Sequence, residues 1–125
     1  LSIPLGGTYR EQAALEALKQ VEVARAALER QRRELELTVS AQVQEAIGSV
    51  ERWRLAEESA AALRETSRLT QKASAAGEAD VQALLLVRRQ ALEATSAEQA
   101  ARAEALRAQY RLQIDAGQLW RSDLP

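Results

Sequence analysis

The sequence predicts an all-α protein, a long antiparallel two-helix hairpin of the coiled-coil type. Ala, Glu, Lys, Leu and Arg account for 76 of the 125 residues, and a content above about half is typical of coiled coils and long helices. Apolar residues recur alternately every four and three positions over much of the chain. Proline occurs only at positions 4 and 125, so nothing between them breaks a helix outright.

Residues 1–7 are expected to form the end of a β-strand. Leu1-Ser-Ile-Pro-Leu5 alternates apolar and small residues, and two glycines then interrupt the pattern. Thr8 and Glu11 have the spacing of a capping box, in which each side chain bonds the backbone N–H of the other residue. A first helix is therefore predicted over residues 8–76, with its first turn at Tyr9.

The first helix carries a heptad seam that can be followed from Ala14 to Thr70. Eleven of its 17 positions are apolar, and Trp53 lies on the seam as a packing residue. At 1.5 Å per residue the helix would be about 100 Å long. We expect the N-terminal part of the seam to pack against another helix through Leu18, Val21, Leu28, Leu35 and Val39.

A tight turn is predicted at residues 77–78, because Gly77 lies where the large apolar residues lapse. A second helix is predicted over residues 79–115, capped by Gly117 and followed by a tail at 116–125. The pairs Glu98/Arg102 and Glu104/Arg107 have spacings typical of exposed helix faces. The residues expected to carry the packing of this helix are Val81, Leu84, Leu85, Arg88, Ala91, Leu92, Leu106 and Tyr110.

The two predicted helices differ in length, so part of the first has no partner in a hairpin. Folding at Gly77 sets Ile114 opposite Ser40 and leaves residues 9–39 uncovered. An apolar stripe of this length is expected to be covered by something outside the hairpin, and the chain by itself is expected to self-associate.

Composition excludes most site chemistry. The chain has no Cys, His, Met or Phe, so it offers no thiol nucleophile, no zinc site of the usual kind and no Ser-His-Asp triad. We expect no enzyme activity, cofactor or metal. A net charge of −1 argues against nucleic acid as a partner. The chain contains no run of about 20 apolar residues, the length that would predict a membrane helix. The start at Leu1 suggests an excised or processed piece.

Three motifs resemble the TolC-like outer-membrane efflux proteins. The opening Leu-Ser-Ile-Pro-Leu-Gly-Gly-Thr-Tyr-Arg10 is similar to that family's passage from a transmembrane strand into a long periplasmic helix. The segment from Ala76-Gly-Glu to Leu-Glu-Ala94 resembles the family's turn and following helix. The closing Ile114-Asp-Ala-Gly-Gln-Leu-Trp120 resembles the ending of the metal-efflux branch. The chain departs from the family in lacking an aromatic residue just before the turn glycine.

The resemblance implies that the chain is the C-terminal helical hairpin of an outer-membrane channel subunit, with a β-barrel in the membrane and an α-barrel in the periplasm. Three copies of the complete protein would form the channel of a tripartite efflux system exporting metal ions or small toxic compounds, such as a heavy-metal resistance system. A periplasmic membrane-fusion adaptor, joined to an inner-membrane pump, would dock at the turn. The docking residues would be Ala75, Ala76, Gly77, Glu78, Ala79 and Asp80.

Alternatives remain open on the sequence alone. The turn could serve only to reverse the chain. Its two acids, Glu78 and Asp80, are ordinary residues for the start of a helix, where a negative charge interacts favourably with the positive end of the helix dipole. The basic residues Arg30, Arg32 and Arg33 alternate with glutamates and are interpreted as a solvated helix face. The hairpin could also belong to a membrane-fusion adaptor or to a structural coiled-coil scaffold.

Overall fold

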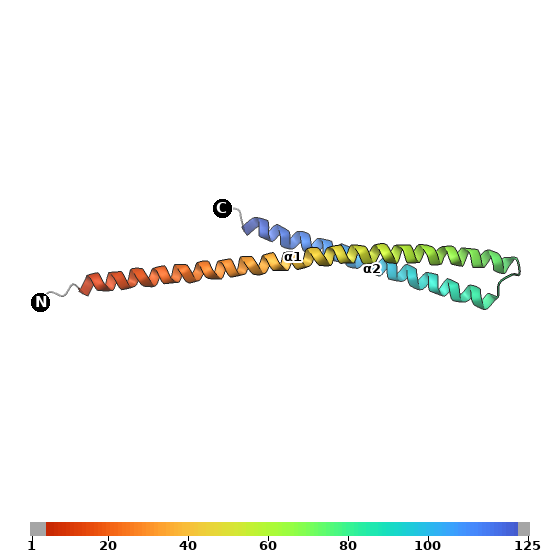
Figure 1. Ribbon diagram of the computed structural model, residues 1–125, viewed down its shortest axis with the longest axis horizontal. Helices are drawn as coiled ribbons and strands as arrows, with labels where there is room; N and C mark the ends of the chain where they lie inside the picture. The colour runs from red at the N-terminus through yellow and green to blue at the C-terminus, as the bar shows by residue number, and fades with distance from the viewer. Residues whose placement is uncertain (1–4, 123–125) are drawn as a thin grey trace. The chain divides into compact units, whose positions relative to one another are not determined.

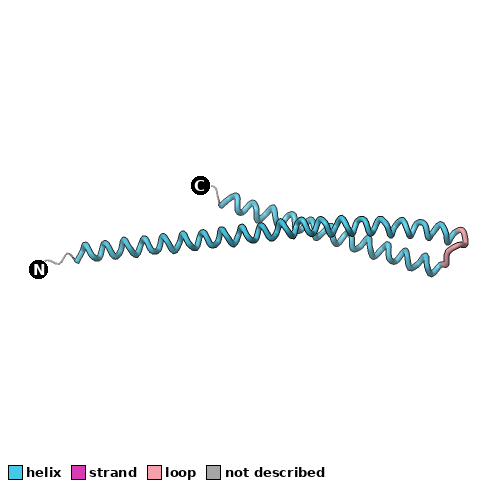
Figure 2. Tube along the Cα trace, in the orientation of Figure 1, coloured by secondary structure: helices cyan, strands magenta, loops and turns pink. Residues whose placement is uncertain are grey.

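The computed structural model describes the backbone of residues 5–122 and the side chains of residues 7–117 and Arg121. Two helices make up nearly all of this part, α1 (Leu5–Ala75) and α2 (Val81–Ser122), and no strand occurs within it. A short loop joins them (Figure 2). The chain divides into two units, Leu1–Thr38 and Val39–Pro125. The predicted all-helical hairpin is therefore confirmed as a fold class, and the hairpin lies in the second unit.

The start of α1 corrects the expectation for residues 1–7. Helix begins at Leu5, so Gly6 and Gly7 are helical rather than the end of a strand, and Thr8 lies inside the helix instead of capping it. Each glycine disfavours helix by about 1 kcal/mol relative to Ala but does not forbid it. The strong helix formers that follow explain why the helix extends through the pair. Residues 1–4 lie outside the described part.

The bounds of the turn and of α2 also differ from the prediction. α1 ends at Ala75, the connection covers residues 76–80, and α2 continues through Gly117 to Ser122 instead of ending at 115. Gly77 alone among the described glycines has a positive φ, so Gly117 does not adopt the left-handed conformation of a helix cap. Most of the predicted tail is therefore helical, and residues 123–125 lie outside the described part.

The first unit is a single helical segment with almost no covered surface. From Gly7 to Thr38 every residue is exposed except Leu35, which is half-buried. Ion pairs run along the segment, between Arg33 and Glu29 at 3.2 Å and between Arg32 and Glu36 at 3.4 Å. They fit the interpretation of this basic cluster as a solvated helix face.

In the second unit, α2 runs back beside residues 39–75 of α1 (Figure 1). Every position of the predicted heptad seam is covered over this region. These positions are Val39, Gln42, Ala46, Ser49, Trp53, Ala56, Ala60, Leu63, Ser67 and Thr70. Beside the seam, Val43, Gly48, Ala73 and Ser74 are also half-buried. Since the same 3.5-residue period sets which side chains face a partner helix, the sequence pattern alone located this half of the interface.

Many exposed ion pairs within each helix accompany this packing. Arg54 pairs with both Glu51 and Glu58, and Arg68 pairs with Glu65 at 2.6 Å. The hydrogen bonds that Arg54 and Arg68 donate lower the pKa of Glu51 and Glu65, and the same bonds raise the pKa of the two arginines. These pairs are solvent-exposed, so each adds little to stability, but together they favour helix over coil.

Candidate functional site: the turn and the helix seam

The turn after α1 is closed by a Schellman motif. Glu78 N–H donates to the carbonyl oxygen of Ala73 at 2.8 Å, and Gly77 N–H donates to that of Ser74 at 3.0 Å. These two bonds satisfy carbonyls that the end of a helix leaves without partners. The geometry requires a left-handed residue at position 77, where φ is +76°. Glycine adopts this conformation without the steric cost that a Cβ brings.

Asp80 begins the second helix. Its backbone carbonyl accepts the N–H of Leu84 at 3.1 Å, which makes Asp80 the N-cap residue of α2. Aspartate is among the preferred residues at that position, and its charge and that of Glu78 lie near the positive end of the helix dipole. Both acids therefore have a structural role at the start of α2 whether or not the turn binds a partner.

The predicted docking residues lie together at this turn. Ala75, Ala76, Gly77, Glu78 and Asp80 are exposed, and Ala79 is half-buried. A Cβ built on Gly77 meets no other atom within 4 Å. The turn thus presents a small, open surface in which the only large side chain is that of Glu78, and another backbone could approach it closely.

Small side chains form the centre of the α1–α2 seam. Ala60, Ala91 and Ala105 are buried, with Ala60 fully covered. Ser49 is also buried and satisfies its hydroxyl within its own helix by donating to the carbonyl oxygen of Ala46 at 2.8 Å. Because Ala and Ser extend little beyond the backbone, this seam allows a close approach of the two helices rather than interlocking of large side chains.

Three polar contacts cross the seam. Gln42 Nε2 donates to Asp115 Oδ2. The Arg102 guanidinium lies over the Trp53 ring, 5.8 Å from its centroid, a geometry that allows a cation–π attraction. Arg64 and Glu98 form an ion pair at 3.6 Å. The sequence placed Val39 opposite Asp115, whereas Gln42, three residues further along α1, makes this contact. Trp53 and Arg102 depart from the expected pairing by one residue, and Arg64 and Glu98 by eight, so the three contacts give no single offset.

The covered face of α2 differs from the one that the sequence indicated. Leu84 and Ala91 are covered as expected, but the exposed residues include Val81, Leu85, Arg88, Leu92, Leu106 and Tyr110. The covered seam is instead formed by Leu84, Val87, Ala91, Ala94, Glu98, Ala101, Ala105, Ala108, Leu112 and Asp115, and Thr95 beside it is also half-buried. Four- and three-residue steps connect the seam positions, and the repeated alanines were the available signal.

Glu98 and Arg102 illustrate the same correction. Their spacing predicts an exposed pair on one helix, yet each contacts α1 instead, Glu98 through Arg64 and Arg102 through Trp53. The second predicted pair, Glu104 with Arg107, does form, at 3.7 Å. The four-residue spacing showed that Glu98 and Arg102 could form a pair on α2. It did not show that side chains of α1 would bind them instead.

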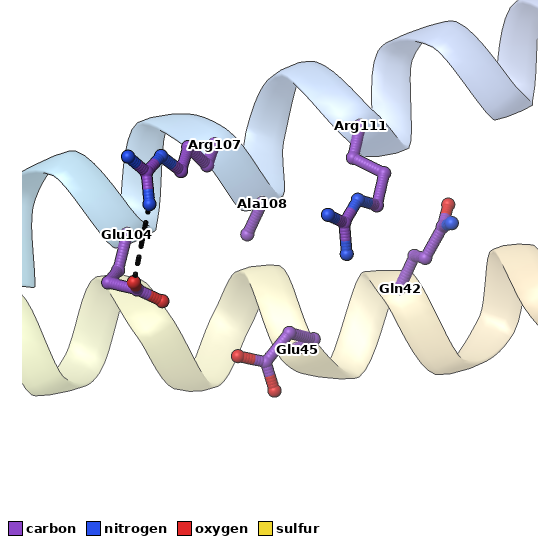
Figure 3. Close-up of a pocket in the computed structure, with 6 residues that line it drawn as sticks. All are labelled: Gln42, Glu45, Glu104, Arg107, Ala108 and Arg111. Atoms are coloured by element: carbon purple, nitrogen blue, oxygen red, sulfur yellow. Dashed lines mark ion pairs between the residues drawn. The ribbon is translucent and has the colours of Figure 1, made fainter.

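An open polar groove of about 210 Å³ lies between the helices beside this pair (Figure 3). Glu45 pairs with Arg52 at 2.7 Å, and the Arg52 guanidinium passes over Gly48, whose Cβ would lie 3.3 Å from Arg52 Nη1. Within the described residues Arg111 makes no ion pair. The groove has no nucleophile or acid–base couple, so its chemistry is electrostatic. Its lining residues are Gln42, Glu45, Glu104, Arg107, Ala108 and Arg111.

The predicted packing residues of the first unit lie on one stripe of α1. The exposed fraction is 60% for Leu18, 49% for Val21 and 68% for Leu28, and Leu35 is half-buried. Val39, the last of the set, belongs to the second unit and is half-buried there. The hairpin therefore covers only the end of the predicted stripe.

By its fold, the second unit is an antiparallel two-helix hairpin. No protein-family model, curated protein or solved structure matches the chain. Over residues 5–122, no three His, Cys, Asp or Glu residues gather as a metal ion would require. Neither described helix has an apolar stretch long enough to cross a membrane.

Proposed function

We propose that this chain is the periplasmic helical hairpin of a TolC-like outer-membrane channel subunit. The observation that carries the proposal is a hairpin with an exposed, glycine-closed turn, joined to a helical segment whose apolar stripe has no cover. In the proposed assembly, a helix from another part of the subunit covers residues 9–39, and three subunits close a tunnel through the periplasm. The role is to conduct exported metal ions or small toxic compounds, and no catalytic step is assigned to the chain.

The turn is proposed as the docking site for a periplasmic adaptor that connects the channel to an inner-membrane pump. Two features support this role, the exposure of Ala75, Ala76 and Gly77 and the free space around Gly77. Two helical hairpins that meet tip to tip need small residues, because only these allow the backbones to approach.

The coding sequence upstream of Leu1 tests the assignment to a channel subunit. A second, similar hairpin together with segments of alternating hydrophobicity would support it. Flanking lipoyl-like halves would instead identify a membrane-fusion adaptor. A continuous heptad pattern without strands would indicate a structural coiled-coil scaffold.

Substitution at the turn in the complete protein tests docking. Gly77→Leu is expected to abolish crosslinking to the adaptor and to reduce export, while the trimer still assembles in the outer membrane. Gly77→Asn is the matched control, because Asn tolerates the left-handed conformation better than Leu and is smaller. Undiminished crosslinking and export in Gly77→Leu, with normal amounts of trimer, would exclude this turn as the docking site.

A further inference from the structure

The uncovered stripe of the first unit contains two cations among its apolar residues. Continuing the heptad, Leu18, Arg25 and Arg32 occupy one core position, and Val21, Leu28 and Leu35 occupy the other. Arg32 pairs with Glu36 on its own helix. Arg25 is exposed and forms no ion pair within the described residues. Any helix that covers this stripe must therefore supply an acid close to Arg25, since a covered charge without a partner is strongly destabilising.

The stripe carries such acids along one of its own edges. Glu22, Glu29 and Glu36 follow each other at seven-residue intervals, each directly after a core position. The opposite edge is uncharged, with Ala17, Ala24 and Gln31. A second copy of this segment would thus bring three acids along the edge of the stripe for its two arginines. Glu29 and Glu36 already pair with Arg33 and Arg32 of their own helix. Glu22 forms no ion pair within the described residues.

The direction of pairing follows from the positions of the arginines. In a parallel pair, equal core positions meet, so Arg25 would face Arg25 of the second copy or, after a shift of one heptad, its Arg32. In an antiparallel pair, the two kinds of core position face each other. Each arginine then lies opposite Val or Leu, with glutamates of both chains along the adjacent edge.

We propose that this segment pairs with the same segment of a second copy of the chain as an antiparallel coiled coil. Leu18 lies opposite Leu35 of the second copy, Val21 opposite Arg32, and Arg25 opposite Leu28. A shift of one heptad in one direction would set Glu11 against Leu35. A shift in the other would need Val39, which the hairpin already covers.

The stripe is available for such a dimer. Leu18, Val21 and Leu28 have exposed fractions of 60%, 49% and 68%. Residues 9–38 extend about 45 Å at 1.5 Å per residue, which gives the pair a seam of about four heptads.

The dimer is a property of this chain by itself and goes beyond the proposed channel function. In a complete channel subunit, a helix of the same protein would cover the stripe and exclude the second copy. Failure to dimerise would therefore leave the channel proposal standing, and failure of adaptor docking would leave the dimer standing.

Disulfide trapping tests both the direction and the register, because the chain has no native cysteine. Mixing Leu18→Cys with Leu35→Cys in a redox buffer should give the mixed disulfide as the main product. Leu18→Cys by itself should stay reduced, since the two sulfurs would lie about 25 Å apart at 1.5 Å per residue. Val23→Cys, on the opposite face, is the control for random collision. A dominant Leu18→Cys homodisulfide would show parallel pairing and overturn the proposal.

Charge reversal at Arg25 tests the electrostatic argument by sedimentation equilibrium. Arg25→Glu would place four acids near one layer and should raise the dimer dissociation constant about tenfold or more. Arg25→Leu should lower it. Arg30→Glu makes the same charge change off the seam and should leave the constant within about twofold. Helicity measured by circular dichroism checks that each variant folds. A monomeric parent chain at high concentration, or equal effects of Arg25→Glu and Arg30→Glu, would overturn the proposal.

Discussion

Ala60 has no exposed surface, and its neighbour Ala61 lies on the open side of the same helix turn. The two residues have the same intrinsic preference for helix, so they separate the effect of packing from that of propensity. The seam around Ala60 leaves no room for a larger side chain unless the helices move apart.

We predict that Ala60→Leu lowers the free energy of unfolding by about 1–3 kcal/mol, the usual cost of overpacking a close contact. Ala61→Leu should change it by less than about 0.5 kcal/mol, as is typical of surface positions. Denaturation followed by circular dichroism measures both. Equal stability of the two variants would mean that the helices do not meet at Ala60.

At Gly77 the constraint comes from the backbone rather than from space. A Cβ would meet nothing within 4 Å, but the φ of +76° disfavours every other residue. We predict that Gly77→Ala lowers the free energy of unfolding by about 1 kcal/mol, and that Gly77→Asn costs less, because Asn visits the left-handed region more readily. Thermal unfolding of the chain measures this. A larger loss for Asn than for Ala would contradict the Schellman geometry.

At the scale of the helices, the contact between Gln42 and Asp115 joins α1 to α2. The buried Gln42 Oε1 has no hydrogen-bond partner within the described structure, so this amide is only partly satisfied. Removing its one partner leaves a covered polar group with no hydrogen bond, whereas replacing both residues removes the problem.

We predict that Asp115→Leu lowers the free energy of unfolding by about 1–3 kcal/mol, because Gln42 is then left without a partner. The double variant Gln42→Leu/Asp115→Leu should recover most of that loss. A double-mutant cycle by chemical denaturation gives the coupling between the two positions. Additive effects would show that the two side chains do not interact.

The agreement between the sequence prediction and the structure differs between the two helices. On α1 the heptad from Val39 to Thr70 was found from the sequence, because Trp53 and Leu63 stand out among small residues on the covered face. On α2 the larger residues, such as Leu85 and Leu92, lie outside the seam, and alanines lie inside it. A prediction that gave most weight to large apolar side chains therefore assigned the wrong covered face to α2.

The helix ends were the other difference. Gly7 was expected to separate a strand from the first helix and Gly117 to end the second helix, but both are helical, whereas Gly77 follows the end of α1. Glycine makes a left-handed helix cap possible without requiring one. The neighbouring residues determine whether the helix ends there. At Gly77 an acid at the next N-cap and a partner helix favour reversal of the chain. The sequence likewise predicted the alignment of the two helices only approximately, since only contacts between the helices can set it.

Over the whole chain, acid should weaken the helices. Hydrogen bonds from Arg54 and Arg68 lower the pKa of Glu51 and Glu65. A lowered pKa means that these pairs stabilise the folded chain fully above the ordinary carboxylate pKa and stop doing so as the pH falls through the lowered value. We predict that helicity, measured by circular dichroism, begins to fall at about pH 4.

The matched control replaces both carboxyl groups. Glu51→Gln/Glu65→Gln should flatten the pH dependence and leave a chain that is slightly less helical at neutral pH. High salt should shrink the difference between the parent and this variant, because exposed pairs are screened. If the parent chain and this variant lose helicity over the same pH range, carboxylates other than Glu51 and Glu65 cause the acid transition.

The alanine seam has a thermal consequence. Alanine has no rotamers to lose on folding, so closing the hairpin costs little side-chain entropy, but it also removes little apolar surface from water. The heat capacity change on unfolding scales with that apolar surface. It should therefore fall below the usual value of about 12–15 cal/mol/K per residue, which scanning calorimetry can measure. A small heat capacity change flattens the dependence of stability on temperature, so cooling should weaken this hairpin far less than it weakens a globular domain of equal length.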